Sequence, residues 1–217
     1  MTRYGWFFGL LFAVGFAHPS FACHQGAGVV LEETFKNPET GWGQANDYVS
    51  YGPSGAGLKL SPGTSLPLLN AHYTSDGTDL CVTGVWPAKA GEYEDTIGVA
   101  FWAKDARNLY FAEISKQGTI TVIRSVAGVW QSLFAEADDK HADLIRKQPG
   151  DSNEVEVQIS GPKTIVWVNG KKIFDLNGQP PAGSGSVGLF TQRVAKGDVS
   201  GDLVPVTFPK FLIAAYP

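Results

Sequence analysis

The stretch Asn153–Leu176, NEVEVQISGPKTIVWVNGKKIFDL, contains three short β-strand patterns one after another. In Val155–Ile159, valine and isoleucine alternate with polar residues, which is the period of a strand with one buried and one solvated face. Gly161-Pro162 interrupts this pattern. A second β-branched and aromatic run then ends at Asn169-Gly170, a dipeptide that favours a tight hairpin turn. Three antiparallel strands therefore fit into this stretch, and an all-β fold is expected.

The same features recur along the rest of the chain, where turn-forming residues separate short apolar runs. The Ala, Glu, Asp, Lys and Leu content of Glu136–Lys147 favours either a short helix or a solvated loop. Many short strands between turns predict a two-sheet antiparallel β-sandwich of the jelly-roll type. The further expected strands are Leu58–Leu60, Leu80–Trp86, Thr96–Ala103, Tyr110–Ile114, Thr119–Arg124, Val129–Phe134, Ser186–Phe190 and Phe208–Tyr216.

The first 22 residues have the order of a secretory signal peptide. Arg3 supplies a positive charge, Trp6–Ala17 is an uncharged apolar run, and small residues flank Phe21. The apolar run is shorter than a membrane-spanning helix, which needs about 20 residues, and an uncleaved N-terminal anchor is the alternative. We expect a signal peptide over residues 1–22 and one sandwich domain over residues 23–217 without a membrane span. The protein would then be exported, to the periplasm or the extracellular space.

Composition supports a folded domain and argues against two classes of partner. The chain of 217 residues is 43% hydrophobic and 12% aromatic, which is enough for a core. Its formal charge is −4 and it has no basic cluster. These features argue against nucleic acid and against anionic membrane surfaces as partners.

Cys23 and Cys81 are the only two cysteines of the chain. An exported protein meets conditions in which disulfides persist, so we expect a bridge between them. A lipidated Cys23 is the rival interpretation, and Ser20 and Phe21 before it disfavour lipidation. Two unconnected thiols also remain open, because sequence does not give the distance between the residues.

Several segments together resemble a known fold family. Val99–Phe134, VAFWAKDARNLYFAEISKQGTITVIRSVAGVWQSLF, resembles the central strands of lectin-like jelly rolls: an Asp-x-x-Asn turn, an aromatic strand, a glycine hairpin, a strand ending in Arg, and Gly-x-Trp. The order continues through Asn153–Leu176, Gly185–Gln192 and Val206–Pro217, and Glu33–Gly43 is similar to the family's opening. These features are typical of the concanavalin-A-like superfamily, including laminin-G-like modules and the 3-keto-disaccharide hydrolase family.

The resemblance implies two packed antiparallel sheets, one of them concave, and covers most of the mature chain. Such folds host lectins, hydrolases and non-catalytic modules, so the fold does not settle the function. The keto-disaccharide hydrolases often carry an Asn-Ser-Gly-Ile run on the strand matching Ile97–Phe101, and a Glu-x-Gln element soon after. Neither element is present in Thr96–Ala103 or Tyr110–Lys116, which weakens an enzymatic assignment.

Three aromatic residues, Trp102, Phe111 and Trp130, are candidates for a sugar-binding platform. Pyranose C–H faces stack on aromatic rings, and amphipathic aromatic side chains suit binding sites. The alternative is that these side chains fill the sandwich core. Trp167 can face either way, because it alternates with Val166 and Val168 on a strand.

Glu113 is the clearest carboxylate candidate. It lies in mid-strand between Phe111 and Ser115, on the face opposite to Tyr110. It could contact a sugar hydroxyl or pair with Arg124 on a neighbouring strand, and both remain open. If the protein is an enzyme, the residues to test are Glu113, Arg124 and His72.

Glycosidases need two carboxylates across the scissile bond. Glu92 and Glu94 would share one face of a strand, but the preceding Gly91 favours a solvated loop there. No histidine of the mature chain has metal ligands at a recognisable spacing, so no cofactor is expected. Oxygen ligands near His72 could hold calcium, although the same residue types form ordinary turns. These oxygen ligands are Asn70, Asp76 and Asp79.

The sequence supports three functional hypotheses. The first is an exported lectin-like module that binds or senses carbohydrate, with a site formed by Trp102, Phe111, Glu113, Arg124 and Trp130. The second is a hydrolase that acts on glycosidic bonds, including those of 3-keto-glycosides. The third is a non-catalytic module that interacts with protein, and an exposed apolar patch in place of a polar hollow would favour it.

Overall fold

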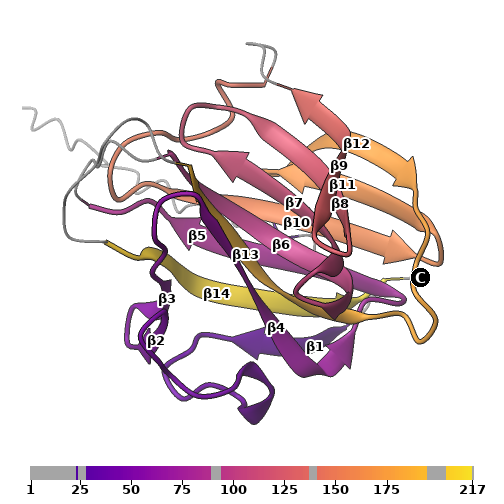
Figure 1. Cartoon of the computed structure of the whole chain (residues 1–217), viewed down its shortest axis with the longest axis horizontal. Helices are drawn as coiled ribbons and strands as arrows, with labels where there is room; N and C mark the ends of the chain where they lie inside the picture. The colour runs from indigo at the N-terminus through magenta and orange to yellow at the C-terminus, as the bar shows by residue number, and fades with distance from the viewer. Residues whose placement is uncertain (1–22, 24–27, 89–93, 137–140, 195–203, 217) are drawn as a thin grey trace, which may run out of the picture.

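The computed structural model consists of two antiparallel β-sheets that pack face to face (Figure 1). It describes residues 23, 28–88, 94–136, 141–194 and 204–216. Within these residues the helical structure is limited to one 3-10 turn, η1 (Thr40–Trp42). The all-β sandwich expected from the sequence is confirmed, whereas the expected signal peptide lies outside the described residues.

The strands divide into sheets of eight and six. The larger sheet has the spatial order β12 (Lys171–Asn177), β11 (Lys163–Val168), β10 (Ser152–Ser160), β5 (Thr78–Val85), β14 (Val206–Ala215), β3 (Gly55–Leu58) and β2 (Val49–Gly52), with β1 (Val29–Glu33) also paired to β14. The smaller sheet has the order β4 (Thr64–Thr74), β13 (Ser186–Val194), β6 (Glu94–Asp105), β7 (Asn108–Ser115), β8 (Ile120–Val126) and β9 (Val129–Glu136).

The three strands expected within residues 153–176 are neighbours at one edge of the larger sheet. Val157 of β10 lies opposite Val166 of β11, and both side chains are buried. Asn169 and Gly170 have φ of 46° and 80°, the left-handed conformation that a tight turn requires. The Asn169 Nδ2 group donates to the carbonyl oxygen of Leu144 at 2.7 Å, which holds the turn against a neighbouring segment.

The main core lies between the two sheets, where alternate side chains of each strand point inward. Val166 and Val168 are among them, so Trp167 points to the outer face of the larger sheet. There its Nε1 group donates to Gln158 Oε1 at 3.1 Å. The largest side chains of this core are Trp42, Trp86, Phe101, Trp102, Phe208 and Phe211.

Sequence patterns missed β1, β2 and the long strand β4, and several expected strand boundaries differ from the observed ones by a few residues. Pro67 breaks the apolar pattern of β4, but the strand tolerates proline because it lies at the edge of its sheet. The strand expected at Leu58–Leu60 is the end of β3, which stops at Leu58. Of the segment expected as a helix or loop, Glu136 ends β9, residues 141–144 form a turn, and residues 145–147 have no regular structure.

Cys23 and Cys81 form a disulfide, with their Cα atoms 5.8 Å apart. Cys81 lies on β5, in the middle of the larger sheet, and its side chain is buried. The bridge therefore fixes Cys23 to the outer face of the sheet, since Cys81 alternates with the core residues Leu80 and Val82.

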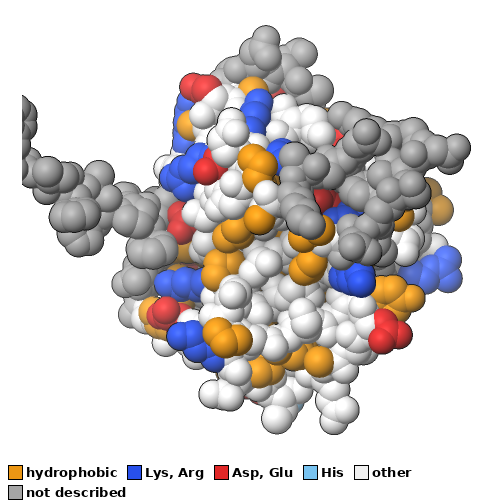
Figure 2. Space-filling view, turned by 90° about the vertical axis from the view of Figure 1, so that its left-hand side faces the viewer, with side chains coloured by type: hydrophobic (Ala, Val, Ile, Leu, Met, Phe, Trp, Pro, Cys, Tyr) orange, Lys and Arg blue, Asp and Glu red, His pale blue; other side chains and the backbone are white. Residues whose placement is uncertain are grey.

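Acidic and basic side chains are interspersed on the described surface shown in Figure 2, and hydrophobic groups lie scattered among uncharged ones. No broad field of one sign is visible on that part of the surface. Across the described ranges, no helix has the length and apolar character needed to cross a membrane.

Candidate concave binding site

The outer face of the smaller sheet is strongly concave. Trp130 on the edge strand β9 lies over Phe190 on β13, with their ring centroids 6.3 Å apart. Three strands lie between β9 and β13, so a flat sheet would separate them by about 19 Å. The sheet must therefore curl until its β9 edge faces β13, and this curvature makes a hollow.

Aromatic rings form the floor and one wall of the hollow. Phe111 of β7 and Phe190 stack at a centroid distance of 3.8 Å, and Trp130 meets Phe111 edge-on at 5.2 Å. Gly98 and Ala100 on β6 lie between the two strands, and their small size lets the rings meet above β6. The two phenylalanines are buried, whereas 43% of Trp130 is exposed. Trp130 is therefore the aromatic surface that a ligand could contact.

The other end of the concave face is a polar pocket of about 140 Å³. Glu113 lies in its wall and is only 3% exposed. Its Oε1 atom accepts hydrogen bonds from Gln192 Nε2 at 2.7 Å and from Thr121 Oγ1 at 3.1 Å. Its buried Oε2 atom has no hydrogen-bond partner among the described residues. The remaining lining residues are Glu94, Thr96, Ser115, Thr119 and Val194.

Burial raises the pKa of the Glu113 carboxyl from its ordinary 4.5 to about 7. Removal from water disfavours the charged form, and the neighbouring Thr96 hydroxyl, Thr121 hydroxyl and Gln192 amide, in that order, only partly oppose this effect. The nearby Glu94 carboxylate raises the pKa further. Glu113 can therefore hold a proton near neutral pH and donate or accept a hydrogen bond within the pocket.

Replacing Glu113 with glutamine should stabilise the protein at alkaline pH. Because the pKa of Glu113 is higher in the folded state than the ordinary 4.5, protonation of this carboxyl favours folding. Its contribution to the free energy of unfolding is complete below pH 4.5 and is lost as pH rises through 7. At pH 8 the charged, buried carboxylate costs about 3 kcal/mol, and glutamine does not ionise. Urea unfolding should therefore show Glu113→Gln to be more stable than wild type at pH 8. The gain should disappear near pH 4.5, and an equal difference at both pH values would contradict the prediction.

Arg124 does not form an ion pair with Glu113. Of the two roles considered for Glu113, contact with a sugar hydroxyl and pairing with Arg124, the second is therefore excluded. In the β7–β8 register Glu113 lies opposite Thr121, whereas Arg124 lies opposite Tyr110. Arg124 and Glu113 consequently face opposite sides of the sheet. The Arg124 guanidinium lies over the Tyr110 ring, 5.6 Å from its centroid.

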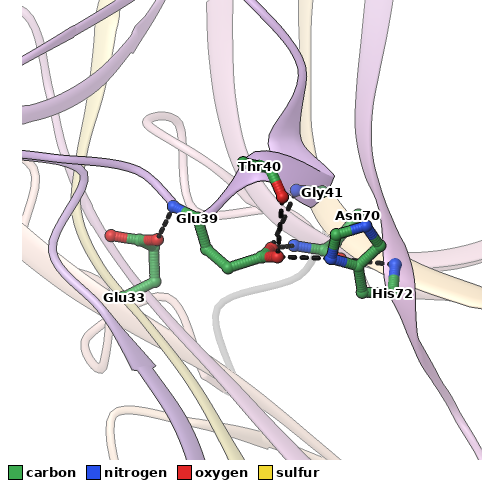
Figure 3. Close-up of polar contacts among 6 residues, drawn as sticks. All are labelled: Glu33, Glu39, Thr40, Gly41, Asn70 and His72. Atoms are coloured by element: carbon green, nitrogen blue, oxygen red, sulfur yellow. Dashed lines mark hydrogen bonds and ion pairs between the residues drawn. The ribbon is translucent and has the colours of Figure 1, made fainter.

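His72 lies on β4, in a different polar network (Figure 3). Its Nδ1 atom contacts the Glu39 carboxylate, which also accepts a hydrogen bond from Asn70 Nδ2 at 3.0 Å and from the Gly41 amide at 2.9 Å. The hydrogen bond from Asn70 is the largest of the interactions that lower the pKa of Glu39. The Glu39 amide in turn donates to Glu33 Oε2 at 2.8 Å. This network ties η1 to β4, so the three residues named for catalysis lie in three separate places.

Two of the oxygen ligands considered for calcium, Asn70 and Asp79, lie in different sheets. Asn70 is engaged with Glu39 beside the smaller sheet, whereas the Asp79 carboxylate of the larger sheet accepts a hydrogen bond from Gln158 at 3.1 Å. Among the described residues, no group of three or more His, Cys, Asp or Glu side chains could hold a metal ion.

The remaining candidates divide between the core and the hollow. Trp102 is 2% exposed and packs in the main core, so it is not a free platform. Glu94 begins β6 and lines the polar pocket, so it is not in a loop, while Glu92 lies outside the described residues. Sequence reasoning did not select Phe190 or Gln192. Their spacing of two on a strand places both on one face, but only the pairing of β13 with β6 brings that face beside Glu113.

Comparison with known proteins places this architecture in a recognised fold. A carbohydrate-binding module from Bacillus subtilis has a TM-score of 0.51 and 16% sequence identity, covering 81% of this chain and 92% of the module. A β-glucanase from Bacillus licheniformis has a TM-score of 0.53 and 15% identity, covering 88% of this chain and 99% of the glucanase.

The chain has a concanavalin-A-like jelly-roll fold. At identities of 16% and 15% the similarity concerns the architecture of this jelly roll and leaves its ligand to be argued from the site. No protein-family model matches the sequence, and no curated protein matches it.

Proposed function

We propose that the protein binds carbohydrate on the concave face of the smaller sheet. The observation that carries this proposal is the half-exposed Trp130 beside a polar pocket. Gln192 joins the two features, because it lines the Glu113 pocket and also a hollow of about 210 Å³ that Trp130 lines. A pyranose needs this combination, since its C–H face packs on an aromatic ring while its hydroxyl groups need hydrogen-bond partners.

The polar pocket supplies groups that suit sugar hydroxyls. Thr121 and Gln192 bring a hydroxyl and an amide, and each of these can both donate and accept. Glu113 adds an Oε2 atom without a partner among the described residues, and a ligand hydroxyl would satisfy it. The two similar structures are a carbohydrate-binding module and a β-glucanase, which agrees with this proposal.

We also propose that the protein works outside the cytoplasm, in the periplasm or the extracellular space. The disulfide between Cys23 and Cys81 supports this placement, because such bridges persist in oxidising compartments. The signal-peptide pattern of residues 1–22 points in the same direction.

Trp130→Ala should weaken glycan binding by about 10-fold or more, since a large aromatic contact often dominates an interface. The measurement is a glycan array on the protein without residues 1–22, followed by calorimetry on each glycan that binds. Tyr48→Ala is the matched control, because Tyr48 is 58% exposed and lies outside the concave sheet. Equal binding by wild type and Trp130→Ala would contradict a site on this face. No binding to any glycan would instead favour a module that interacts with protein.

Hydrolysis of glycosidic bonds is the second candidate, and one observation favours it. Glu113, with its pKa of about 7, and Glu94 line the same pocket, so a proton donor and a second carboxylate lie close together. Release of reducing ends from a bound glycan or 3-keto-glycoside would support this activity. Turnover should then disappear in Glu113→Gln, and turnover that survives the change would exclude Glu113 as the acid.

A further inference from the structure

Two adjoining hollows lie away from the concave face, on the inner side of the smaller sheet. Their volumes are about 300 and 260 Å³, and Tyr110, Arg124 and Gln179 line both of them. Tyr110 and Arg124 point to the inner side of the sheet and Phe111 to the concave face, although Leu109 of the concave-face cluster also lines the first hollow. Phe174 of β12 lines the second hollow, which therefore opens between the edges of the two sheets. We call the pair the end hollow.

The charged side chains that line the end hollow are positive. Lys104 and Arg124 line it, and none of its lining residues in the described part of the chain is an aspartate or glutamate. The Arg124 guanidinium lies over the Tyr110 ring and makes no hydrogen bond or ion pair within the described part of the chain. Lys104 lies beside the exposed Asp105, whose carboxylate accepts a hydrogen bond from Asn108 of the lining at 3.0 Å, so Arg124 supplies most of the uncompensated positive charge. The end hollow is therefore suited to an anion.

Contacts within the protein hold the residues around Arg124 in fixed positions. The Tyr110 hydroxyl accepts a hydrogen bond from the Gln179 amide at 3.1 Å, and the Tyr110 ring meets Trp102 edge-on at 5.0 Å. Trp102 has φ of 49°, a left-handed conformation that is unfavourable for a bulky side chain. Its amide donates to Ser75 Oγ at 2.7 Å, which helps to hold that conformation. Strained residues of this kind are concentrated at functional sites.

The segment between β12 and β13 closes tightly on Trp102. A Cβ atom at Gly178 would lie 2.2 Å from the Trp102 ring, and one at Gly185 would lie 2.5 Å from its backbone. Pro180 and Pro181 of the same segment line the end hollow and restrict its backbone. The wall that carries Gln179 is consequently packed and stiff, which favours binding because little ordering is needed.

We propose that the end hollow is a second binding site, which takes the carboxylate of a uronic-acid residue in an acidic glycan. A guanidinium offers two parallel N–H groups that match the two oxygens of a carboxylate, and Lys104 adds a second positive charge. Leu176 and Pro181 supply an apolar wall for the body of the sugar ring. The choice of a sugar as carrier of the carboxylate rests on the proposed carbohydrate function, whereas the anion site rests on its own residues.

The test is an NMR titration of isotope-labelled protein with trigalacturonate. The Arg124 Nε–H signal and the Gln179 amide signal should shift, and the fully methyl-esterified trimer should leave both unchanged because it lacks the charge. Arg124→Gln should weaken trigalacturonate binding by about 10-fold or more, and Arg124→Lys should fall between it and wild type. Arg107→Gln is the matched control, since Arg107 is an exposed arginine that donates to Ala127 O at 2.6 Å and does not line the hollow.

Several outcomes would overturn the proposal. It fails if trigalacturonate leaves the Arg124 and Gln179 signals in place, or if folded Arg124→Gln and Arg124→Lys both bind it as wild type does. If acetate binds as tightly as trigalacturonate, the hollow recognises only the carboxylate, which would contradict the proposal that the ligand is a sugar. Loss of neutral-glycan binding at the concave face would not affect these signals, so failure of the proposed function and failure of the end hollow are distinguishable. Trp130→Ala should leave the trigalacturonate shifts unchanged.

Discussion

Replacing Arg193 with methionine is expected to lower the free energy of unfolding by about 3–5 kcal/mol. Arg193 is 2% exposed, and its Nε atom lies 2.6 Å from Asp95 Oδ1. Its two terminal nitrogens donate to Leu60 O at 3.0 Å and to Val204 O at 2.7 Å. Without the arginine, a buried carboxylate and two carbonyl oxygens lose their donor, and none of them regains full contact with water.

Urea unfolding of three variants tests this prediction. Lys210→Met is the matched control, because the Lys210–Glu32 ion pair is more exposed, with a distance of 3.3 Å, and should contribute less than about 1 kcal/mol. Adding Asp95→Asn to Arg193→Met should recover part of the loss, since the buried charge is then removed. A loss below about 1 kcal/mol in Arg193→Met would show that the pair is not a main support of the fold.

Removing the disulfide is expected to lower the free energy of unfolding by about 4 kcal/mol. The sequence separation of Cys23 and Cys81 is 58 residues, and the bridge restricts the unfolded chain over all of them. The enclosed segment includes β1 to β4, which contribute to both sheets. The bridge therefore limits the unfolded freedom of strands that must be placed on opposite sides of the core.

The measurement is urea unfolding of the double variant Cys23→Ala and Cys81→Ala. A reducing agent should cause a similar loss in the wild-type protein and no change in the double variant, which separates loss of the bridge from loss of buried side chains. An unchanged unfolding midpoint after confirmed reduction would contradict the prediction. The same experiment bears on the proposed export, because a protein that depends on its disulfide needs an oxidising compartment.

The arrangement of the two proposed sites has a consequence for ligand choice. The concave face offers Trp130 and the Glu113 pocket, whereas the end hollow offers Arg124 and Lys104. One side of the smaller sheet thus suits a neutral sugar and the other an anionic one. An acidic glycan with neutral residues could engage both sites, in which case the combined affinity would exceed that of either site.

The three strands within residues 153–176 show how much of the fold can be predicted from residues that are close together in the sequence. Alternation of valine and isoleucine with polar residues predicted β10, and Asn169-Gly170 predicted the turn between β11 and β12. Period and turn chemistry act over a few residues, so sequence alone carries them. Strand β4 was not predicted in this way, because a proline such as Pro67 is acceptable only in a strand at a sheet edge. Which strand lies at the edge depends on how all the strands pair.

The sequence by itself determined the all-β class and the strands β10 to β12. It also determined that Phe111 and Glu113 share a face, because they are two residues apart on one strand. All of these features depend on residues that are close together along the chain. Only the tertiary structure decided that Arg124 lies on the opposite face, since a shift of one residue in strand register reverses the side to which a residue points. It also decided that Trp130 meets Phe190 across three strands, because the curl of a sheet arises from the packing of the whole sandwich.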